Sequence, residues 1–372
     1  MTLVAVAISA FAEPSDSSSA AKFIGTPVAS ASSDEGIVIG AVAGFASENG
    51  DVVYLSAYQS TKRYTGLGLR GEFNAGDWRL VTKNYLTRIS RKVYPAAGDV
   101  VEEYAHATVN RLQIDLSALK AFDANFLCGN KLSLLELGHT FVMDISQAEN
   151  PEDINGESLN LEQLWAFQRA STAQLGLRLR IRTTSASRPL NGFVFDSRLL
   201  AGRTSGERLS KPKFKFDESF STWLAVARPL SHSTRLYLRG SWQLQGLAPA
   251  PISNWLGGDN TLRGQPDHRD LGREVAMGRA QLHQTLISEW LFPMKTVNRV
   301  LSFFPVWAVN VEVVGFYDIG RCGDPDFGWN PIRQGYGCGF RVVVPPELTL
   351  AFDFAITPHG GKMFYFGMGE TL

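Results

Sequence analysis

The chain has 372 residues, with 36 lysine and arginine side chains against 36 aspartate and glutamate side chains, so its net charge is zero. This balance gives no basic surface of the kind that nucleic-acid-binding proteins use, and no window of eighteen apolar residues offers a transmembrane helix. Glycine (35 residues) and aromatic residues (11%) are somewhat frequent and charged residues (19%) somewhat rare, a composition that is typical of β-barrels.

The chain opens with an apolar segment. Residues 1–12 end in Ala-Phe-Ala before Glu13, which has the form of an apolar core followed by an A-x-A cleavage site, although no basic region precedes it. We therefore predict a signal-peptide-like segment over 1–12 and a flexible serine-rich linker over 13–21. A short first strand is the alternative interpretation of 1–12. A protein that is exported without a helical anchor is periplasmic, secreted or an outer-membrane barrel.

From residue 22 onward the dominant pattern is alternation between apolar and polar side chains. In 175–182, for example, Leu175, Leu177 and Leu179 alternate with Arg178 and Arg180. This period of two predicts β-strands. A soluble sandwich also alternates, but large apolar faces, charges in mid-strand and lengths near ten residues favour strands that cross a membrane. Backbone groups in lipid must pair with one another, which only a closed barrel achieves without helices.

We therefore predict an all-β fold for 22–372, an antiparallel transmembrane β-barrel of sixteen strands. The predicted strands are 22–32, 36–47, 52–60, 64–74, 77–92, 104–119, 131–146, 172–184, 192–203, 217–229, 234–245, 279–292, 306–320, 335–344, 348–357 and 362–372. The even number puts both chain ends on the periplasmic side. The longest connection, about 247–278, is then extracellular, and a loop of this length is usually functional or disordered. Residues 158–170 have the spacing of a short amphipathic helix, which we interpret as a loop helix on the barrel rim.

The three cysteines, Cys128, Cys322 and Cys338, fit no metal-binding spacing. They are either ordinary unpaired thiols or include a Cys322–Cys338 disulfide in an exposed loop, which would need an oxidising compartment. The six histidines also lack metal spacing, and no G-x-S-x-G elbow is present. The charged cluster around His268 has the composition of a solvated loop. We predict no enzymatic activity, no metal and no cofactor.

The long connection contains the most informative motif. Its sequence from Gly257 to Gly264, GGDNTLRG, resembles the G-G-x-x-x-[VL]-R-G-[YF] loop motif of the bacterial surface antigen family, the barrel of BamA- and TamA-type assembly factors and two-partner secretion transporters. Further matches follow in the family's order, at 289–293 (EWLFP), 316–320 (FYDIG), 335–341 (GYGCGFR) and 362–372. The chain departs from the pattern at Gln265, Leu291 and Leu372, where the family has an aromatic residue, an arginine and a phenylalanine.

The resemblance implies that the long loop folds into the barrel and that its arginine pairs with acidic wall residues. The loop-plug motif would comprise Gly257, Gly258, Leu262, Arg263 and Gly264. Arg263 would then meet Asp318 and also Glu289. Alternation independently puts both acids on lumenal faces, and such a pairing would be charge-assisted and costly to break. The alternative is a solvated surface arginine in a glycine-rich turn.

The last segment has the pattern of a closing strand. One face carries Phe364, Phe366, Met368 and Leu372, and small residues such as Gly367 lie on the other. We expect the apolar face to meet outer-membrane lipid and the small residues to leave room for the loop. The resemblance implies that outer-membrane assembly machinery recognises this strand. The alternative, an edge strand of a soluble sheet, would aggregate in water.

Three functions compete at this stage. Relatives insert or secrete surface polypeptides, usually with periplasmic POTRA domains ahead of the barrel. Here only about ten residues separate the signal-peptide-like segment from the first strand, too few for one such domain. Either a separate periplasmic partner protein captures the substrate, or the activity has been lost. We expect the barrel itself to lie in the outer membrane of a Gram-negative bacterium. The second hypothesis is a passive or plugged pore, or structural barrel, whose lumenal arginines favour anions. The third is an outer-membrane lipid hydrolase that depends on His283. The sequence leaves open the cargo, whether transport is retained and the oligomeric state. The lumenal arginines of the second hypothesis are Arg178, Arg180, Arg182, Arg235 and Arg239.

Overall fold

A computed structural model describes residues 22–32, 36–47, 51–62, 64–93, 105–123, 134–153, 155, 170–183, 192–208, 211–245, 254–258, 261–266, 269–291, 308–324, 328–344 and 348–368. The predicted signal-peptide-like segment, the linker, Cys128 and all but the last residue of the predicted helix at 158–170 lie outside these residues. Among the described residues there is no helix with the length and apolar character needed to cross a membrane.

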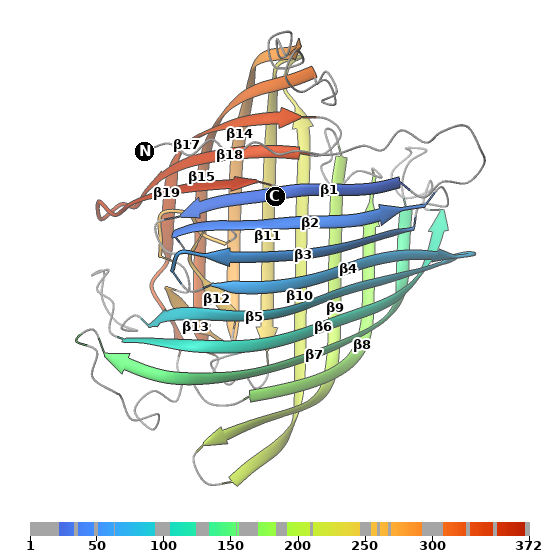
Figure 1. Ribbon diagram of the computed structural model, residues 1–372, viewed down its shortest axis with the longest axis vertical. Helices are drawn as coiled ribbons and strands as arrows, with labels where there is room; N and C mark the ends of the chain where they lie inside the picture. Colours follow the sequence, from blue (N-terminus) through green and yellow to red (C-terminus); the bar gives the residue numbers. More distant parts are fainter. Residues whose placement is uncertain are drawn as a thin grey trace.

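Sixteen long strands form the wall of the molecule (Figure 1). They are β1 (Lys22–Ser32), β2 (Gly36–Ala46), β3 (Val52–Ser60), β4 (Thr65–Ala75), β5 (Trp78–Val93), β6 (Ala105–Asp123), β7 (Leu134–Asp153), β8 (Ala170–Arg182), β9 (Gly192–Arg208), β10 (Lys211–Pro229), β11 (Thr234–Gln245), β14 (Glu274–Leu291), β15 (Ala308–Asp324), β17 (Arg333–Val344), β18 (Leu348–Ile356) and β19 (Lys362–Met368). Three short strands complete the description: β12 (Asn254–Leu256), β13 (Asp270–Gly272) and β16 (Gly328–Trp329).

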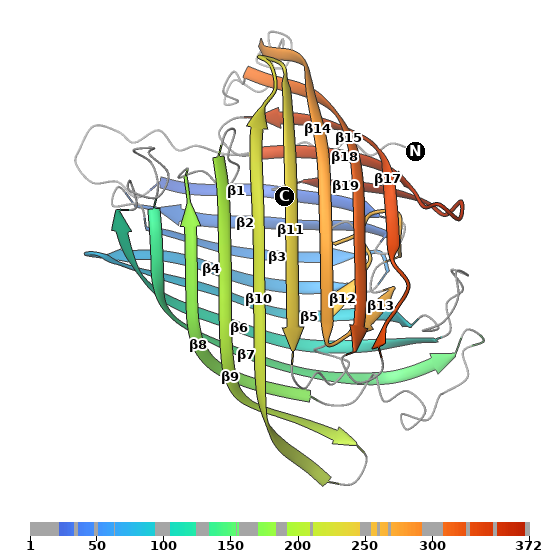
Figure 2. The same ribbon diagram turned by 180° about the vertical axis from the view of Figure 1, so that it is seen from behind.

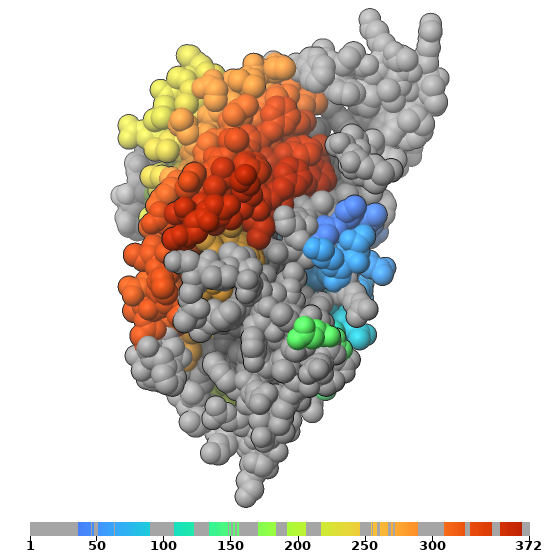
Figure 3. Space-filling model, turned by 90° about the vertical axis from the view of Figure 1, so that its left-hand side faces the viewer, coloured from blue at the N-terminus to red at the C-terminus, as the bar shows by residue number. Residues whose placement is uncertain are grey.

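Each long strand pairs antiparallel with the long strands before and after it in sequence, and β1 also pairs with β19. The sixteen strands therefore follow one another around a ring, and the predicted antiparallel barrel of sixteen strands is confirmed. Figure 1 shows the first strands, in blue to green, crossing one side of this ring, and Figure 2 shows β9, β10, β11 and β14 on the other. In Figure 3 the C-terminal strands (red) and the N-terminal strands (blue) both reach one face of the molecule.

The two faces of the wall differ as the alternation predicts. On β8 and β9, Leu175 and Leu199 are 60% and 59% exposed on the outer face, whereas Gln174 and Asp196 are each only 3% exposed inside. An apolar outer face with a polar, buried interior is the arrangement of a membrane barrel, because lipid surrounds the outside and protein or water fills the inside.

The pairing that closes the ring, between β1 and β19, is the shortest pairing between long strands in the described residues. Among the described residues, β1 and β19 pair only at Ala31 with Phe366 and at Ser32 with Tyr365. By contrast, β1 pairs with β2 over eleven residue pairs and β18 with β19 over seven. We call this short β1–β19 contact the seam. It is held by far fewer backbone hydrogen bonds than its neighbours.

Several strands run further than the hydrophobic pattern predicted. The β9–β10 hairpin, expected to stop at 203 and to restart at 217, stays paired out to Arg208 and Lys211. Figure 2 shows it continuing past its neighbours. Backbone hydrogen bonds continue between antiparallel strands whether or not the side chains alternate in polarity, so pairing extends beyond the apolar band.

The proposed Cys322–Cys338 disulfide is wrong. Cys322 is buried inside the barrel, Cys338 is exposed on the outer face, and neither forms a disulfide. Cys338 is registered with Gly315, seven residues from Cys322 along β15. Strand alternation thus puts the two sulfur atoms on opposite sides of the wall, where no bond can form.

The long connection between β11 and β14 folds inward, as predicted. Its strands β12 and β13 pair with each other inside the barrel, against β14 and β15. Leu256 and Leu262 of this connection pack with Val275 and Cys322 of the wall in one buried apolar cluster. We call the described part of the connection, 254–258, 261–266 and 269–273, the plug loop.

Candidate functional site

The plug loop is shaped by glycines and one threonine. Gly257, Gly258 and Gly264 have φ values of 123°, 91° and 90°, which L side chains rarely adopt. The Thr261 hydroxyl accepts a hydrogen bond from the Gly257 amide at 2.8 Å and donates one to the Gly257 carbonyl at 2.6 Å. The Gly258 amide donates to the Gln265 carbonyl at 3.0 Å. These local bonds turn the chain so that the side chain of Arg263 points at the wall.

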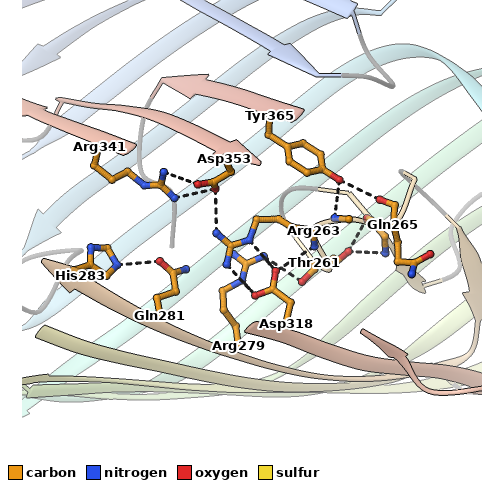
Figure 4. A network of polar contacts seen from close by, with 12 residues as sticks. Thr261, Arg263, Gln265, Arg279, Gln281, His283, Asp318, Arg341, Asp353 and Tyr365 are labelled. Carbon is orange, nitrogen blue, oxygen red and sulfur yellow. Dashed lines mark hydrogen bonds and ion pairs between the residues drawn. The ribbon is translucent and has the colours of Figure 1, made fainter. Parts of the chain in front are cut away.

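Arg263 joins the loop to two strands of the wall (Figure 4). Its Nε and Nη2 donate to the two carboxylate oxygens of Asp318 on β15, at 2.8 and 2.9 Å, and its backbone amide adds a third bond at 3.1 Å. Its Nη1 donates to Asp353 on β18 at 3.0 Å. We call Arg263, Asp318 and Asp353 the clamp. Arg263 is 2% exposed and Asp318 0%, so these charge-assisted bonds form away from bulk water.

Two wall arginines also bind the acids of the clamp, so three guanidinium groups surround two carboxylates. Arg279 donates from Nε to Asp318 at 3.1 Å, and Arg341 binds Asp353 with two nitrogens at 2.6 and 2.9 Å. The guanidinium of Arg263 also lies 3.6 Å from the ring centre of Phe316, which stabilises its charge. Burial opposes that charge, but hydrogen bonds and attraction from the two carboxylates outweigh burial and raise the pKa of Arg263.

The backbone of the loop, like its arginine, is hydrogen-bonded to the wall. The Tyr365 hydroxyl on β19 accepts a hydrogen bond from the Gly264 amide at 3.1 Å and donates to the Gln265 carbonyl at 3.2 Å. Gly335 on β17 supplies the room, because a Cβ atom there would lie 1.7 Å from the Arg263 carbonyl oxygen. These contacts add β17 and β19 to the wall strands that the loop touches, besides β14, β15 and β18.

Part of this site was predicted correctly from the sequence. The structure brings the five predicted motif residues, Gly257, Gly258, Leu262, Arg263 and Gly264, together inside the barrel, and Arg263 does meet Asp318. Pairing with Glu289 is a correction. Its side chain lies outside the described residues, and its backbone is ten residues along β14 from Arg279, the partner in register with Asp318. At about 3.3 Å per residue, that separation is far beyond the reach of an arginine. The second carboxylate that binds Arg263 is that of Asp353, not that of Glu289.

Sequence reasoning missed Asp353, Arg279, Arg341 and Tyr365 as parts of the site. Asp353 stood on the polar face of its predicted strand, and Arg341 ends the GYGCGFR motif, so the signal that could have found them was lumenal parity on neighbouring strands. In the closing strand, Phe364 is 48% exposed and Phe366 packs on Phe352 with ring centres 4.6 Å apart. The side chain of Met368 and all of Leu372 lie outside the described residues.

His283 lies in a separate lumenal network. Its Nδ1 is 3.0 Å from Glu312 Oε2 and its Nε2 is 2.9 Å from Gln281 Oε1, so both ring nitrogens face these partners rather than a serine hydroxyl. Arg235 forms an ion pair with the same Glu312. Within the part of the chain that the structure describes, no group of three or more histidine, cysteine or acidic side chains could hold a metal ion.

Three solved structures are similar to the chain over most of its length. CdiB from Escherichia coli matches with a TM-score of 0.62 and 13% identity, over 93% of this chain and 62% of that one. CdiB from Acinetobacter baumannii matches with a TM-score of 0.57 and 13% identity, over 93% and 59%. BamA from Haemophilus ducreyi lacking POTRA domains 1–3 matches with a TM-score of 0.53 and 14% identity, over 94% and 70%.

The chain has the fold of the CdiB and BamA barrels. It spans about three fifths of the length of the two CdiB chains. No family model matches the sequence, and no curated protein is similar to it in sequence.

Proposed function

We propose that this chain is an outer-membrane barrel of the bacterial surface antigen type, in a Gram-negative bacterium, that assists the insertion or translocation of polypeptides. The fold shared with BamA and CdiB supports the proposal. The observation that carries it is the clamp, in which buried ion pairs hold a glycine-rich loop inside the lumen. Charges are buried at a high cost unless they are paired, so the loop is built to dock at this place.

The plug loop is bound to the wall without being one of its strands. Side-chain bonds tie the loop to the wall: Arg263 binds Asp318 and Asp353, Tyr365 and Arg279 bind the loop backbone, and Asp270 of the loop binds Arg333 of β17. Beneath it, β15, β17 and β18 stay hydrogen-bonded to one another through their own backbones. Undocking the loop therefore breaks no wall hydrogen bond. We infer a closed resting state whose loop leaves its site while a polypeptide is handled.

The seam offers a second movable part. Two residue pairs join β1 to β19, so opening this contact costs less than opening any other described pairing between long strands. An opened seam would present two strand edges with unpaired backbone groups, and such edges bind extended polypeptide by adding a strand. We propose the seam as the place where a polypeptide meets the barrel.

The proposed partners follow from the same surfaces. Outer-membrane lipid surrounds the apolar outer face, and outer-membrane assembly machinery recognises the closing strand with Phe364 and Phe366. A separate periplasmic protein delivers the polypeptide. We propose no hydrolytic activity, since His283 is engaged by Glu312 and Gln281; a lipid hydrolysis assay on the purified protein checks this.

A disulfide across the seam tests the proposal. Ala31→Cys and Phe366→Cys introduce two thiols at registered positions, in a Cys338→Ser background that removes the exposed native thiol. Proteoliposomes with this variant receive an unfolded outer-membrane barrel, and its folding is followed by heat-modifiable mobility. We expect oxidation to abolish assisted folding and reductant to restore it.

The matched control puts the disulfide between β2 and β3. Ala41 and Ala57 are likewise in register with each other, and both are exposed. Ala41→Cys and Ala57→Cys, however, join strands that already pair over nine residue pairs. Oxidation of this variant should leave assisted folding unchanged. Full activity with an oxidised seam would refute polypeptide entry at β1–β19, and no assistance by the unmodified protein would refute the function itself.

A passive, plugged pore is the second candidate. The lumenal arginines Arg178, Arg180 and Arg235 favour it, because a closed assembly barrel does not require cations in its lumen. Single-channel recording separates the two: a large, steady conductance indicates a pore, whereas a closed barrel with rare openings indicates a docked plug.

A further inference from the structure

A row of small residues runs along the outer face of β14, on the wall behind the plug loop. Ala276, Gly278 and Ala280 follow one another in this row, and Gly240 of β11 is in register with Gly278. Their outward position follows from alternation, because Arg279 points into the lumen toward the clamp. Figure 2 shows β11, β14 and β15 next to one another on this side of the barrel. From Ala276 to Ala280 the row extends over about 13 Å, at about 3.3 Å per residue.

Large side chains on the neighbouring strands turn this row into a groove. Two cavities, with volumes of about 550 and 400 Å³, lie over the row and have both Gly240 and Gly278 in common, so they form one continuous groove. Each cavity has the size of a typical ligand site. The bordering side chains are Leu224 of β10, Leu238 and Trp242 of β11, and Tyr317 and Ile319 of β15. The lipid-facing wall is therefore not smooth at this place but has an apolar channel along β14.

One end of the groove has a cation. Arg321 lines the groove there and is in register with Ala276. Its Nε donates to the Asn330 carbonyl at 2.9 Å, and its guanidinium lies 5.1 Å from the ring centre of Trp329. These two contacts hold the exposed guanidinium at the rim of the groove. Its two Nη nitrogens have no hydrogen-bond partner among the residues that the structure describes, so they can donate to a ligand.

The same end also has an acid and two tryptophans. Glu274 accepts a hydrogen bond from the indole Nε1 of Trp242 at 2.8 Å, and within the described part of the chain it forms no ion pair with Arg321. The β11–β14 connection leaves the wall at this end, which is the extracellular end in the predicted orientation. Rings of aromatic side chains lie at the membrane–water boundary of such barrels, and Trp242 and Trp329 have this position. Arg321 is thus at the level of lipid head groups.

We propose that the groove binds an acyl chain of a phosphorylated lipid from the extracellular leaflet and that Arg321 binds the phosphate of that lipid. A chain on Gly240 and Gly278 touches the backbone below it and side chains on both sides. It therefore makes more van der Waals contacts than it would on a smooth wall. A guanidinium and a phosphate form charge-assisted hydrogen bonds. The proposal depends on the position of the barrel in the membrane and not on polypeptide insertion.

The width of the groove favours an extended chain over a protein helix. At both of its ends, β14 alone separates the bordering side chains of β11 from those of β15. The backbones of β11 and β15 are therefore about 10 Å apart, and their side chains narrow this gap further. An α-helix with its side chains is about 10–12 Å wide and does not enter such a gap.

Native mass spectrometry of the purified barrel in detergent tests the binding directly, because it counts the lipids that stay bound. The probe is lipid A, the phosphorylated anchor of lipopolysaccharide. Lipid A without its phosphates and phosphatidylglycerol are the comparisons. We expect one retained lipid A per barrel and binding that is about tenfold weaker once the phosphates are removed, since the bonds to Arg321 are lost. Equal retention of phosphatidylglycerol would overturn the assignment to the extracellular leaflet.

Filling the groove is the second test. In Gly240→Leu, the new Cβ atom meets no atom closer than 4.0 Å, so the variant should fold while its side chain occupies the groove. Gly315→Leu is the matched control, because Gly315 is also exposed on the outer face with open space around it but lies outside both cavities. We expect Gly240→Leu to lose the retained lipid A and Gly315→Leu to keep it. Undiminished retention in Gly240→Leu would refute the site, and so would a dimer that this variant dissociates.

Replacing the cation tests the head-group contact separately. Arg321→Gln should bind lipid A about tenfold more weakly, as weakly as the unmodified protein binds the form without phosphates. Arg228→Gln, which removes an exposed arginine from the outer face of β10 away from the groove, should bind like the unmodified protein. Equal losses in both variants would contradict a specific role of Arg321. Assisted folding of a client barrel is measured on the same samples. Its absence alongside retained lipid A contradicts the insertion function but not this site.

Discussion

Replacing Arg263 by alanine removes the side chain that binds the plug loop to both Asp318 and Asp353. Three side-chain hydrogen bonds to carboxylates and the contact with Phe316 are lost. Breaking a buried ion pair costs about 3–5 kcal/mol. Here Asp318 keeps Arg279 and Asp353 keeps Arg341, so neither acid is left without a cation. We therefore expect the low end of that range, about 3 kcal/mol against docking of the loop.

At about 1.4 kcal/mol per factor of ten, this change increases the undocked population on the order of 100-fold. The wall is not involved, so the Arg263→Ala barrel should still form and show heat-modifiable mobility at reduced yield. Single-channel recording measures the effect as a rise in open probability of the same order. Limited proteolysis of the loop provides an independent readout.

The conservative variant refines the result. Arg263→Lys keeps the charge but cannot make two parallel bonds to Asp318, so its open probability should fall between those of alanine and arginine. Arg228→Gln on the outer face should behave like the unmodified protein. An open probability and a protease resistance that are both unchanged in Arg263→Ala would refute the plug.

Three further changes act on the same loop. Gly335→Ala puts a Cβ atom 1.7 Å from the Arg263 carbonyl and should raise open probability, whereas Gly315→Ala on β15, with open space around it, should not. Tyr365→Phe removes both hydroxyl bonds to the loop and should weaken docking by about 1–3 kcal/mol, measured as protease sensitivity. In a Cys128→Ser, Cys338→Ser background, Cys322, buried under the loop, should react with maleimide slowly and should react rapidly after Arg263→Ala; equal rates would contradict its burial by the plug.

The wall could be predicted from the sequence because each strand has two different environments. Leu175 and Arg178 differ in polarity for a local reason, lipid on one side and an enclosed interior on the other, and this difference is repeated along every strand. Strand ends beyond the apolar band, as at Arg208 and Lys211, carry no such signal, because backbone pairing does not depend on which side chains are present.

The site could be predicted only in part. Parity shows which face Asp318 and Asp353 occupy, and the loop motif points to Arg263. Neither pattern shows how far the loop reaches along the barrel axis. The sequence therefore could not decide whether Asp353 or Glu289 is the second acid that binds Arg263. The predicted strand 306–320 ended before Cys322, so parity could not exclude the disulfide; the observed β15 continues to Asp324 and puts Cys322 and Cys338 on opposite faces.

The plug and the seam differ sharply in the length of chain that they join. Every side chain of the clamp comes from the last third of the sequence, whereas the seam unites the two extremes of the chain. Bringing distant parts of a chain together costs more conformational entropy than forming a local contact. At the seam, only two described residue pairs offset this cost. The C-terminal strands can therefore assemble around their own loop early during biogenesis, and circularisation of the sheet is the last event, and the first to be reversed.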